Sequence, residues 1–193
     1  MPILTFTLKG DELKHHTVNL HKPLNLRYFK LLHVSTNISS ANLNIKGVKA
    51  SGGGDGHPVT YSIDTIASEQ ALMFLKLSFL NSDDVSFYER SADGTQYVHN
   101  VFSIGDTALG DRRIESKDLF KMLTTRPIQV HQPFTIDMYA FDTTVTEHTG
   151  ATVTAARNQL RPLKDINTGS IPKDIFLTLS FEYDEYDTAP RTH

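Results

Sequence analysis

The residues Asp174–Tyr183, which read D-I-F-L-T-L-S-F-E-Y, constrain the fold more than any other stretch of the chain. Successive side chains of a β-strand point to opposite faces, so this stretch has one apolar face and one mostly polar face. Such a strand is half-buried in an antiparallel sheet, and its apolar face needs a second sheet to cover it. The apolar face comprises Ile175, Leu177, Leu179, Phe181 and Tyr183.

Length and composition set the class of protein. A chain of 193 residues with 39% apolar and 21% charged residues is typical of one soluble domain. The net charge of −3 and the scattered basic residues predict no nucleic-acid binding. The chain has no cysteine, which excludes disulfides, thiolate metal sites and a cysteine nucleophile, and leans towards a reducing compartment. We expect neither a signal peptide nor a membrane span, because the longest apolar run, 71–75, ends at Lys76.

The same two-residue alternation predicts strands along most of the chain. The Asp93-Gly94 pair predicts a tight hairpin between two of them. The predicted strands span Ile3–Lys9, Leu13–Leu20, Asn25–Val34, Ala41–Val48, Val59–Ile63, Gln70–Leu80, Val85–Glu89, Thr95–Ile104, Pro133–Phe141 and Asp174–Tyr183.

One helix and three irregular segments complete the prediction. Ser116 can cap a helix over Ser116–Leu123, because Leu119, Phe120 and Leu123 share a helical face. Four glycines and a proline within 51–58 predict a flexible loop. The polar, Thr-rich segment 143–172 is predicted as a long loop, and 184–193 as a C-terminal tail; either can dock on other chains or stay disordered.

Turn signals roughly every 8–12 residues indicate an all-β sandwich or barrel. We therefore predict one domain over 1–193, an all-β single jelly-roll sandwich of about eight antiparallel strands with one short helix. An immunoglobulin-type sandwich is the nearest alternative, but its core Cys and Trp are absent, because the chain has no residue of either type.

No motif predicts catalysis, so we expect no enzyme, cofactor or metal site. The nine histidines include no H-x-H pair, and the adjacent His15 and His16 point to opposite faces of a strand. The glycines of 52–56 lack a phosphate-binding motif, and no G-x-S-x-G elbow positions a nucleophile. Asp83-Asp84 and the acidic group Asp184, Glu185 and Asp187 lack the spacing of a calcium loop.

The strand pattern resembles that of the minor capsid, or penton, proteins of icosahedral double-stranded DNA viruses, including the virophages. The resemblance is carried by the absence of cysteine, the small predicted helix before the strand Phe134–Phe141, and the final strand of I-F-L-T-L-S-F-E-Y type. It implies a structural virion protein, made in the host cytoplasm, which forms a homopentamer at the vertices beside the major capsid protein. It implies no catalytic residues.

Two other functions remain open. A carbohydrate- or receptor-binding jelly-roll module would use the loops 51–58 and 143–172 together with Tyr61, Tyr88 or Tyr97. A cupin-like metalloenzyme would require an H-x-H pair, a nearby Glu and a distant third His.

Overall fold

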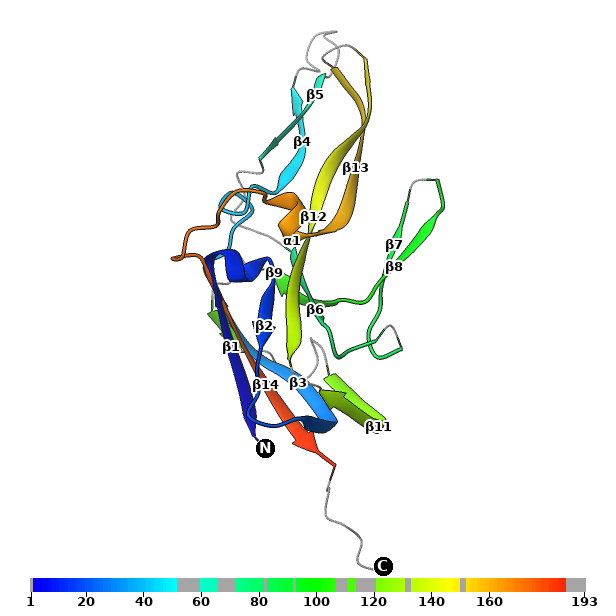
Figure 1. Ribbon diagram of the computed structural model, residues 1–193. Helices are drawn as coiled ribbons and strands as arrows, with labels where there is room; N and C mark the ends of the chain where they lie inside the picture. Colours follow the sequence, from blue (N-terminus) through cyan, green and yellow to red (C-terminus); the bar gives the residue numbers. More distant parts are fainter. Residues whose placement is uncertain are drawn as a thin grey trace, which may run out of the picture.

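The computed structural model describes residues 2–51, 60–65, 72–81, 83–91, 93–106, 111–113, 121–130, 133–149 and 152–186. Within these ranges the chain is mostly β-structure, arranged as two antiparallel sheets packed face to face and one separate hairpin (Figure 1). Two short helical elements accompany the strands, the 3-10 turn η1 (Gly10–Leu13) and the helix α1 (Leu163–Ile166).

The first sheet contains the strand that the sequence indicates most clearly. Its strands run in the order β1-β14-β3-β10, and β11 pairs with the same edge of β3 as β10. All pairings are antiparallel. The strands are β1 (Ile3–Lys9), β3 (Leu24–Thr36), β10 (Asp111–Arg113), β11 (Lys121–Val130) and β14 (Phe176–Glu185).

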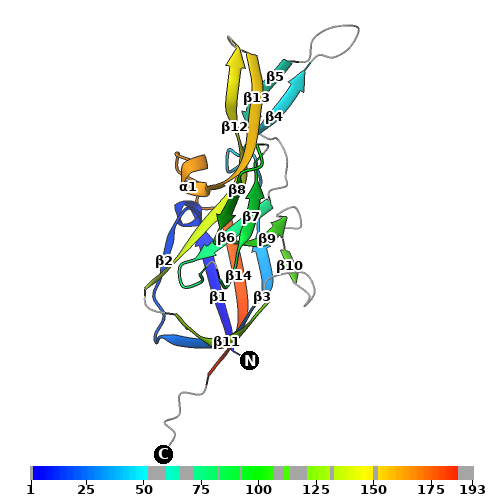
Figure 2. The same ribbon diagram turned by 90° about the vertical axis from the view of Figure 1, so that its right-hand side faces the viewer.

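The second sheet has the order β4-β5-β13-β12-β6-β9, and β2 pairs with the beginning of β12. In both views, β4, β5, β13 and the adjoining part of β12 extend beyond one end of the sandwich as an arm (Figures 1 and 2). The strands are β2 (His16–Val18), β4 (Lys46–Ser51), β5 (Thr60–Thr65), β6 (Leu72–Leu77), β9 (Phe102–Asp106), β12 (Phe134–Thr149) and β13 (Thr152–Pro162).

The core lies between the two sheets and uses the apolar parity of each strand. Phe181 on β14 is fully buried and stacks on Phe29 of β3 with ring centroids 4.5 Å apart. From the second sheet, Ile136 and Leu75 are also fully buried. Burying a side chain of this size stabilises the folded state by about 1.5–3 kcal/mol. The predicted sandwich and the alternation of its last strand are therefore confirmed.

A bulge explains why the buried parity changes along β3. Phe29 and Leu31 are buried before it, and Val34 is buried after it. The register with β14 shifts between Ser180 and Phe181 at the same level. A bulge inserts one residue into one strand, so the following side chains switch faces.

The predicted helix over Ser116–Leu123 is wrong in its last turn. Lys121, Met122 and Leu123 belong to β11 and pair with Lys30, Phe29 and Tyr28. The free edge of β3 supplies hydrogen-bond partners that outweigh the helical spacing of a few apolar residues. Residues 116–120 lie outside the described part of the chain.

The predicted long loop 143–172 is also wrong. Residues up to Thr149 continue β12, and Thr152–Pro162 forms β13, which returns antiparallel to it. Threonine and valine favour strands through their branched side chains, even without apolar alternation. The predicted loop 51–58 lies outside the described residues except for Ser51, which ends β4. In the predicted tail, Asp184 and Glu185 belong to β14, and 187–193 is not described.

The alternating segment Ala41–Val48 starts as a turn, and its strand begins only at Lys46. Ser39 and Asn42 hydrogen-bond each other's backbone N–H at 2.8 and 3.1 Å, and Asn44 adopts a positive φ of 57°. Such side-chain to backbone bonds compete with a sheet ladder. The predicted strand Leu13–Leu20 is likewise shortened to β2, and Thr95–Ile104 is interrupted at Asn100 and Val101.

Candidate functional site

The feature that stands apart from the sandwich is the hairpin of β7 (Phe87–Arg90) and β8 (Gln96–His99). It lies in the chain between β6 and β9, yet these two strands pair directly with each other. Among the described strands, β7 and β8 pair only with each other. Figure 1 shows the hairpin standing out from one flank, and Figure 2 shows it in front of the second sheet. The hairpin is therefore an addition to the sheet and not one of its members.

The register of the hairpin separates its side chains into two faces. Tyr88 pairs with Val98, and both point outward, with 60% and 53% of their surface exposed. Phe87 pairs with His99 on the opposite face, which is turned towards the second sheet. The outer face therefore presents an apolar pair to solvent on a projecting ribbon.

The inner face of the hairpin covers a small aromatic cluster outside the main core. Phe87 lies 4.7 Å from Phe74 of β6 and 5.9 Å from Phe141 of β12, measured between ring centroids. Phe74 is only 1% exposed although it belongs to the outer face of the second sheet. We call this cluster the outer patch; on the sheet side it comprises Phe74, Val101, Tyr139, Phe141 and Leu160.

A buried carboxylate attaches the hairpin to β13. Glu89 is 8% exposed, and its Oε2 accepts hydrogen bonds from the backbone N–H of Leu160 at 3.2 Å and from His99 Nε2 at 3.1 Å. Arg157 Nη2 lies 3.6 Å from Glu89 Oε1. A buried carboxylate is tolerated only with such partners. Arg157 also lies over the Tyr97 ring at 4.7 Å, and the Tyr97 hydroxyl raises the pKa of Arg157.

A second buried carboxylate attaches the arm in a similar way. Asp142 of β12 is 3% exposed. It accepts hydrogen bonds from the backbone N–H of Lys46 and from Arg161 Nη1, both at 2.8 Å. The first residue of β4 and the end of β13 are thus joined to β12 at the base of the arm. Each addition to the sandwich is therefore attached in part by one buried acidic side chain.

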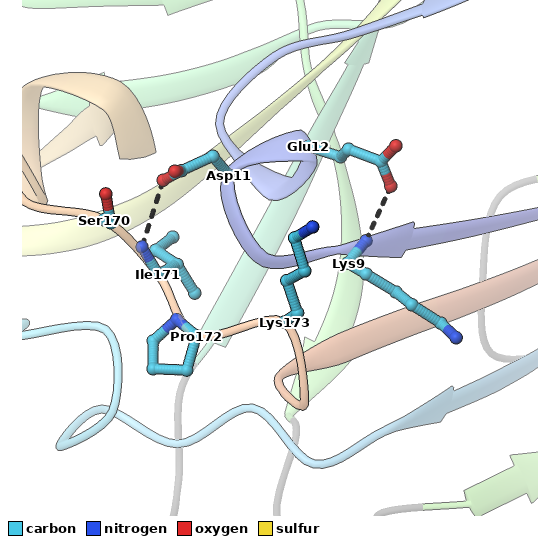
Figure 3. A pocket seen from close by; sticks show the side chains of 7 residues that line it. All are labelled: Lys9, Asp11, Glu12, Ser170, Ile171, Pro172 and Lys173. Carbon is cyan, nitrogen blue, oxygen red and sulfur yellow. Dashed lines mark hydrogen bonds between the residues drawn. The ribbon is translucent and has the colours of Figure 1, made fainter.

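A groove of about 590 Å³ lies at the junction of β1 and η1 (Figure 3). Asp11 accepts a hydrogen bond from the Ile171 N–H at 3.0 Å, which, together with the Lys14 ammonium, lowers the pKa of Asp11. Glu12 accepts one from the Lys9 N–H at 3.0 Å. Figure 3 shows the Lys9 and Lys173 side chains pointing in different directions. Both carboxylates therefore serve local structure, and the two ammonium groups do not converge on a ligand.

The histidines of the described residues are spread over the molecule. His15 Nδ1 lies 2.7 Å from Asp137 Oδ1, and His16 Nδ1 lies 3.8 Å from Glu12 Oε1. Within the described ranges, no three side chains of the His, Asp, Glu or Cys type gather as metal ligands would. Asp84 closes its own turn by accepting a hydrogen bond from the Asn81 N–H at 2.9 Å.

Two of the three tyrosines of the predicted glycan site, Tyr88 and Tyr97, lie on opposite faces of the hairpin. Tyr88 points outward on β7, whereas Tyr97 pairs with Glu89 and lies on the inner face against Arg157. Tyr61 belongs to β5 in the arm, where its backbone pairs with Ala50 and Val153. A ligand that stacks on the Tyr88 ring therefore faces away from the Tyr97 ring, which lies on the other face of the hairpin.

The sequence prediction missed Glu89 and Asp142, which organise the additions to the sandwich. A signal was present, because each acidic residue occupies the parity that its strand buries. Glu89 shares its parity with Phe87, and Asp142 shares its parity with Met138 and Ala140.

Across the residues that the structure describes, no helix is long and apolar enough to cross a membrane. Comparison with protein-family models, with curated proteins and with solved structures finds no match to this chain.

Proposed function

We propose that this chain is a single jelly-roll capsid subunit of the minor, or penton, class, which assembles with copies of itself into a pentameric ring. The observation that carries the proposal is the nesting of the strand pairs. A jelly roll wraps two Greek keys so that the first strand pairs with the last and the second with the last but one.

Four antiparallel pairs fit this nesting. β1 pairs with β14, and β2 with β12. β3 pairs with β11, and β6 with β9. The resulting sheets have the orders β1-β14-β3-β11 and β2-β12-β6-β9. On this proposal, β4, β5, β7, β8, β10 and β13 are additions within the connections of an eight-stranded jelly roll.

The placement of the insertions favours a subunit that assembles with other copies over a protein that binds a small ligand in a pocket. The arm and the hairpin both leave the sandwich at its periphery (Figures 1 and 2). A closed ring requires two different surfaces on each subunit that fit each other. Projecting insertions provide such surfaces, and a stable contact buries on the order of 800 Å² on each partner. In the virion the ring would lie at a vertex and contact the neighbouring major capsid protein.

Native mass spectrometry and sedimentation of the purified chain over a wide concentration range test this proposal. We expect a species of five subunits that grows with concentration at the expense of monomer. Electron microscopy of that species would show a ring. A chain that remains monomeric at the highest attainable concentration contradicts the proposal.

Glycan or receptor binding is the second candidate, and it is favoured by the exposed Tyr88 ring on the projecting hairpin. An exposed aromatic ring offers a large apolar face with one polar end. A glycan array with the intact protein and with Tyr88→Ala tests this function. Specific signals that disappear in the variant would support it, and an empty array at high protein concentration would oppose it.

A further inference from the structure

We propose that the free edge of β1 is a pairing surface for the same strand of a second copy, so that two chains join their first sheets antiparallel across Thr5. This inference goes beyond the proposed ring. A ring needs two different surfaces on each subunit, whereas this contact uses one surface twice. The two contacts are therefore separate and can be tested separately.

The outer edge of β1 is identified by the hydrogen bonds at its two ends. β1 is the last strand on its side of the first sheet, and among the described strands it pairs only with β14 (Figure 2). The Tyr183 N–H donates to the Pro2 carbonyl, and the Gly10 N–H donates to the Ile175 carbonyl. Bonds to one antiparallel neighbour recur at every second residue. The even-numbered residues of β1 therefore bind β14, and the odd-numbered ones face outward.

The open ladder consists of Ile3, Thr5 and Thr7. Within the described part of the chain, the backbone N–H and C=O groups of these three residues have no partner. The next outward N–H, that of Lys9, already donates to the Glu12 carboxylate at 3.0 Å. The ladder is thus limited to three alternate residues and is symmetric about Thr5.

This edge lacks the features that keep strand edges of different chains apart. Charged side chains, prolines and bulges at an edge prevent pairing between chains. The residues between Pro2 and Lys9 read I-L-T-F-T-L, without charge, proline or glycine. Their register with β14 runs without a shift. Short uncharged segments of high strand propensity pair readily with identical segments.

The other sheet edges of the described chain match this ladder less well. β10 has three residues, two of them arginine, and β2 has only three residues. β11 contains Pro127 and shifts register between Leu123 and Ile128, and β9 is shifted against β6. β4 carries Lys46 and Lys49. The described edge that matches β1 in length and in its absence of charge is β1 itself, which selects a second copy as the occupant.

A two-fold axis at Thr5 satisfies all of the open groups. Ile3 then lies opposite Thr7 of the second copy, and Thr5 lies opposite Thr5. Each opposed pair exchanges two backbone hydrogen bonds, which gives about six bonds in the contact. The two Lys9 residues lie at opposite ends, about 27 Å apart, so no like charges meet. On the outer face, hydroxyl side chains already meet across β1 and β14, because Thr5 lies 3.1 Å from the Ser180 hydroxyl.

Charges introduced at Thr5 test the pairing, because the two-fold axis places this residue against itself. Like charges directly opposite each other weaken a strand pair, and unlike charges support it. Thr5→Lys alone and Thr5→Glu alone should each raise the dissociation constant by about fivefold, and an equal mixture of the two should restore it. Sedimentation and native mass spectrometry over a concentration series measure these constants.

Ser180→Lys is the matched control, because Ser180 lies beside Thr5 in the same row of the sheet but one strand further from the edge. In the paired sheets the two Ser180 positions are about 14 Å apart, where the charges are largely screened. Hydrogen exchange of the natural chain needs no variant. The Thr5 and Thr7 amides should become protected as concentration rises, whereas the Phe6 amide, which faces β14, should be protected throughout.

The outcomes separate this inference from the proposed function. Protection of the Thr5 and Thr7 amides together with restored association in the mixture supports the pairing. Unchanged exchange at these amides at the highest attainable concentration overturns it, and so does a mixture that associates no better than either variant alone. A five-subunit species with open Thr5 and Thr7 amides leaves the ring standing without the pairing. Pairs without a five-subunit species leave the pairing standing without the ring.

Discussion

The main core and the outer patch are built from the same kind of side chain but covered in different ways. In the core, Phe181 lies between two sheets and touches the rings of Phe29, Phe6 and Phe102. In the outer patch, Phe74 packs against Phe141 of its own sheet and is covered from outside by Phe87 of a two-stranded hairpin. A two-stranded hairpin is marginally stable by itself, so its attachment depends on the patch and on Glu89. Aromatic burial therefore joins the two sheets in one region and attaches a peripheral hairpin in the other.

The largest effect should separate the two regions directly. Phe181→Ala leaves a cavity between the sheets and should lower the free energy of unfolding by about 3–5 kcal/mol. Phe87→Ala should lower it by about 1–2 kcal/mol, because the loss cannot exceed the free energy that closes the hairpin. Chemical denaturation measures both. Equal losses would mean that the hairpin and the sandwich unfold as one unit.

Two glycines with positive φ sharpen the same comparison. Gly10 has φ +58°, and a Cβ there would lie 2.9 Å from the Ile171 carbonyl oxygen. Gly94, in the hairpin turn, has φ +87° and open space around it. Gly10→Ala should therefore cost about 2–3 kcal/mol in unfolding free energy, and Gly94→Ala only about 1 kcal/mol. A larger loss at Gly94 would contradict the view that the hairpin is a peripheral addition.

Glu89→Gln tests the carboxylate that attaches the hairpin. The amide keeps an acceptor for the Leu160 N–H but loses the charge that Arg157 faces. The free energy needed to open the hairpin should therefore fall by about 1–2 kcal/mol. Hydrogen exchange at the Leu160 amide reports the opening, since this N–H is bonded to Glu89. Exchange should accelerate there, whereas fully buried Leu179 of β14 should be unaffected. Unchanged hydrogen exchange at Leu160 would show that the Glu89 charge does not attach the hairpin to β13.

The smallest effect is expected at the exposed pair of Arg27 and Asp184 on the first sheet. The Arg27 guanidinium holds the pKa of Asp184 below its ordinary value. The stabilisation is therefore present above the pKa of an unfolded aspartate and is lost as pH falls through the lowered folded pKa. Asp184→Asn should remove this acid-dependent part, and salt should weaken it in the natural chain. Denaturation midpoints measured between neutral and acidic pH check the prediction.

Alternation along single strands was enough to predict the sandwich. The strand Ile3–Lys9 has the predicted bounds, and β14 buries Leu177, Leu179 and Phe181 as predicted, whereas Tyr183 is half-buried. The alternation within each of these strands indicates which of its faces is buried, because side chains alternate with a period of two. The Asp93-Gly94 turn was also predictable from local sequence, since Gly94 supplies the positive φ that the hairpin requires.

Alternation failed where another part of the chain decided the outcome. Leu123 became a strand residue because β3 offers it an open edge, and that edge is created by residues far away in sequence. The end of β12 and the strand β13 were missed because the Thr-rich segment 143–162 alternates no apolar face. Local hydrogen bonds of Ser39 and Asn42 converted an alternating segment into a turn.

The sequence by itself determined that two apolar sheet faces must meet, because each strand has one apolar face that has to be buried. Only the tertiary structure decided which strands pair, which carboxylates are buried and what covers Phe74. These features depend on contacts between residues that are far apart in the sequence, such as Glu89 and Leu160, which lie 71 positions apart. Pairing over such separations is selected by the collective packing of the whole fold, and no local pattern encodes it.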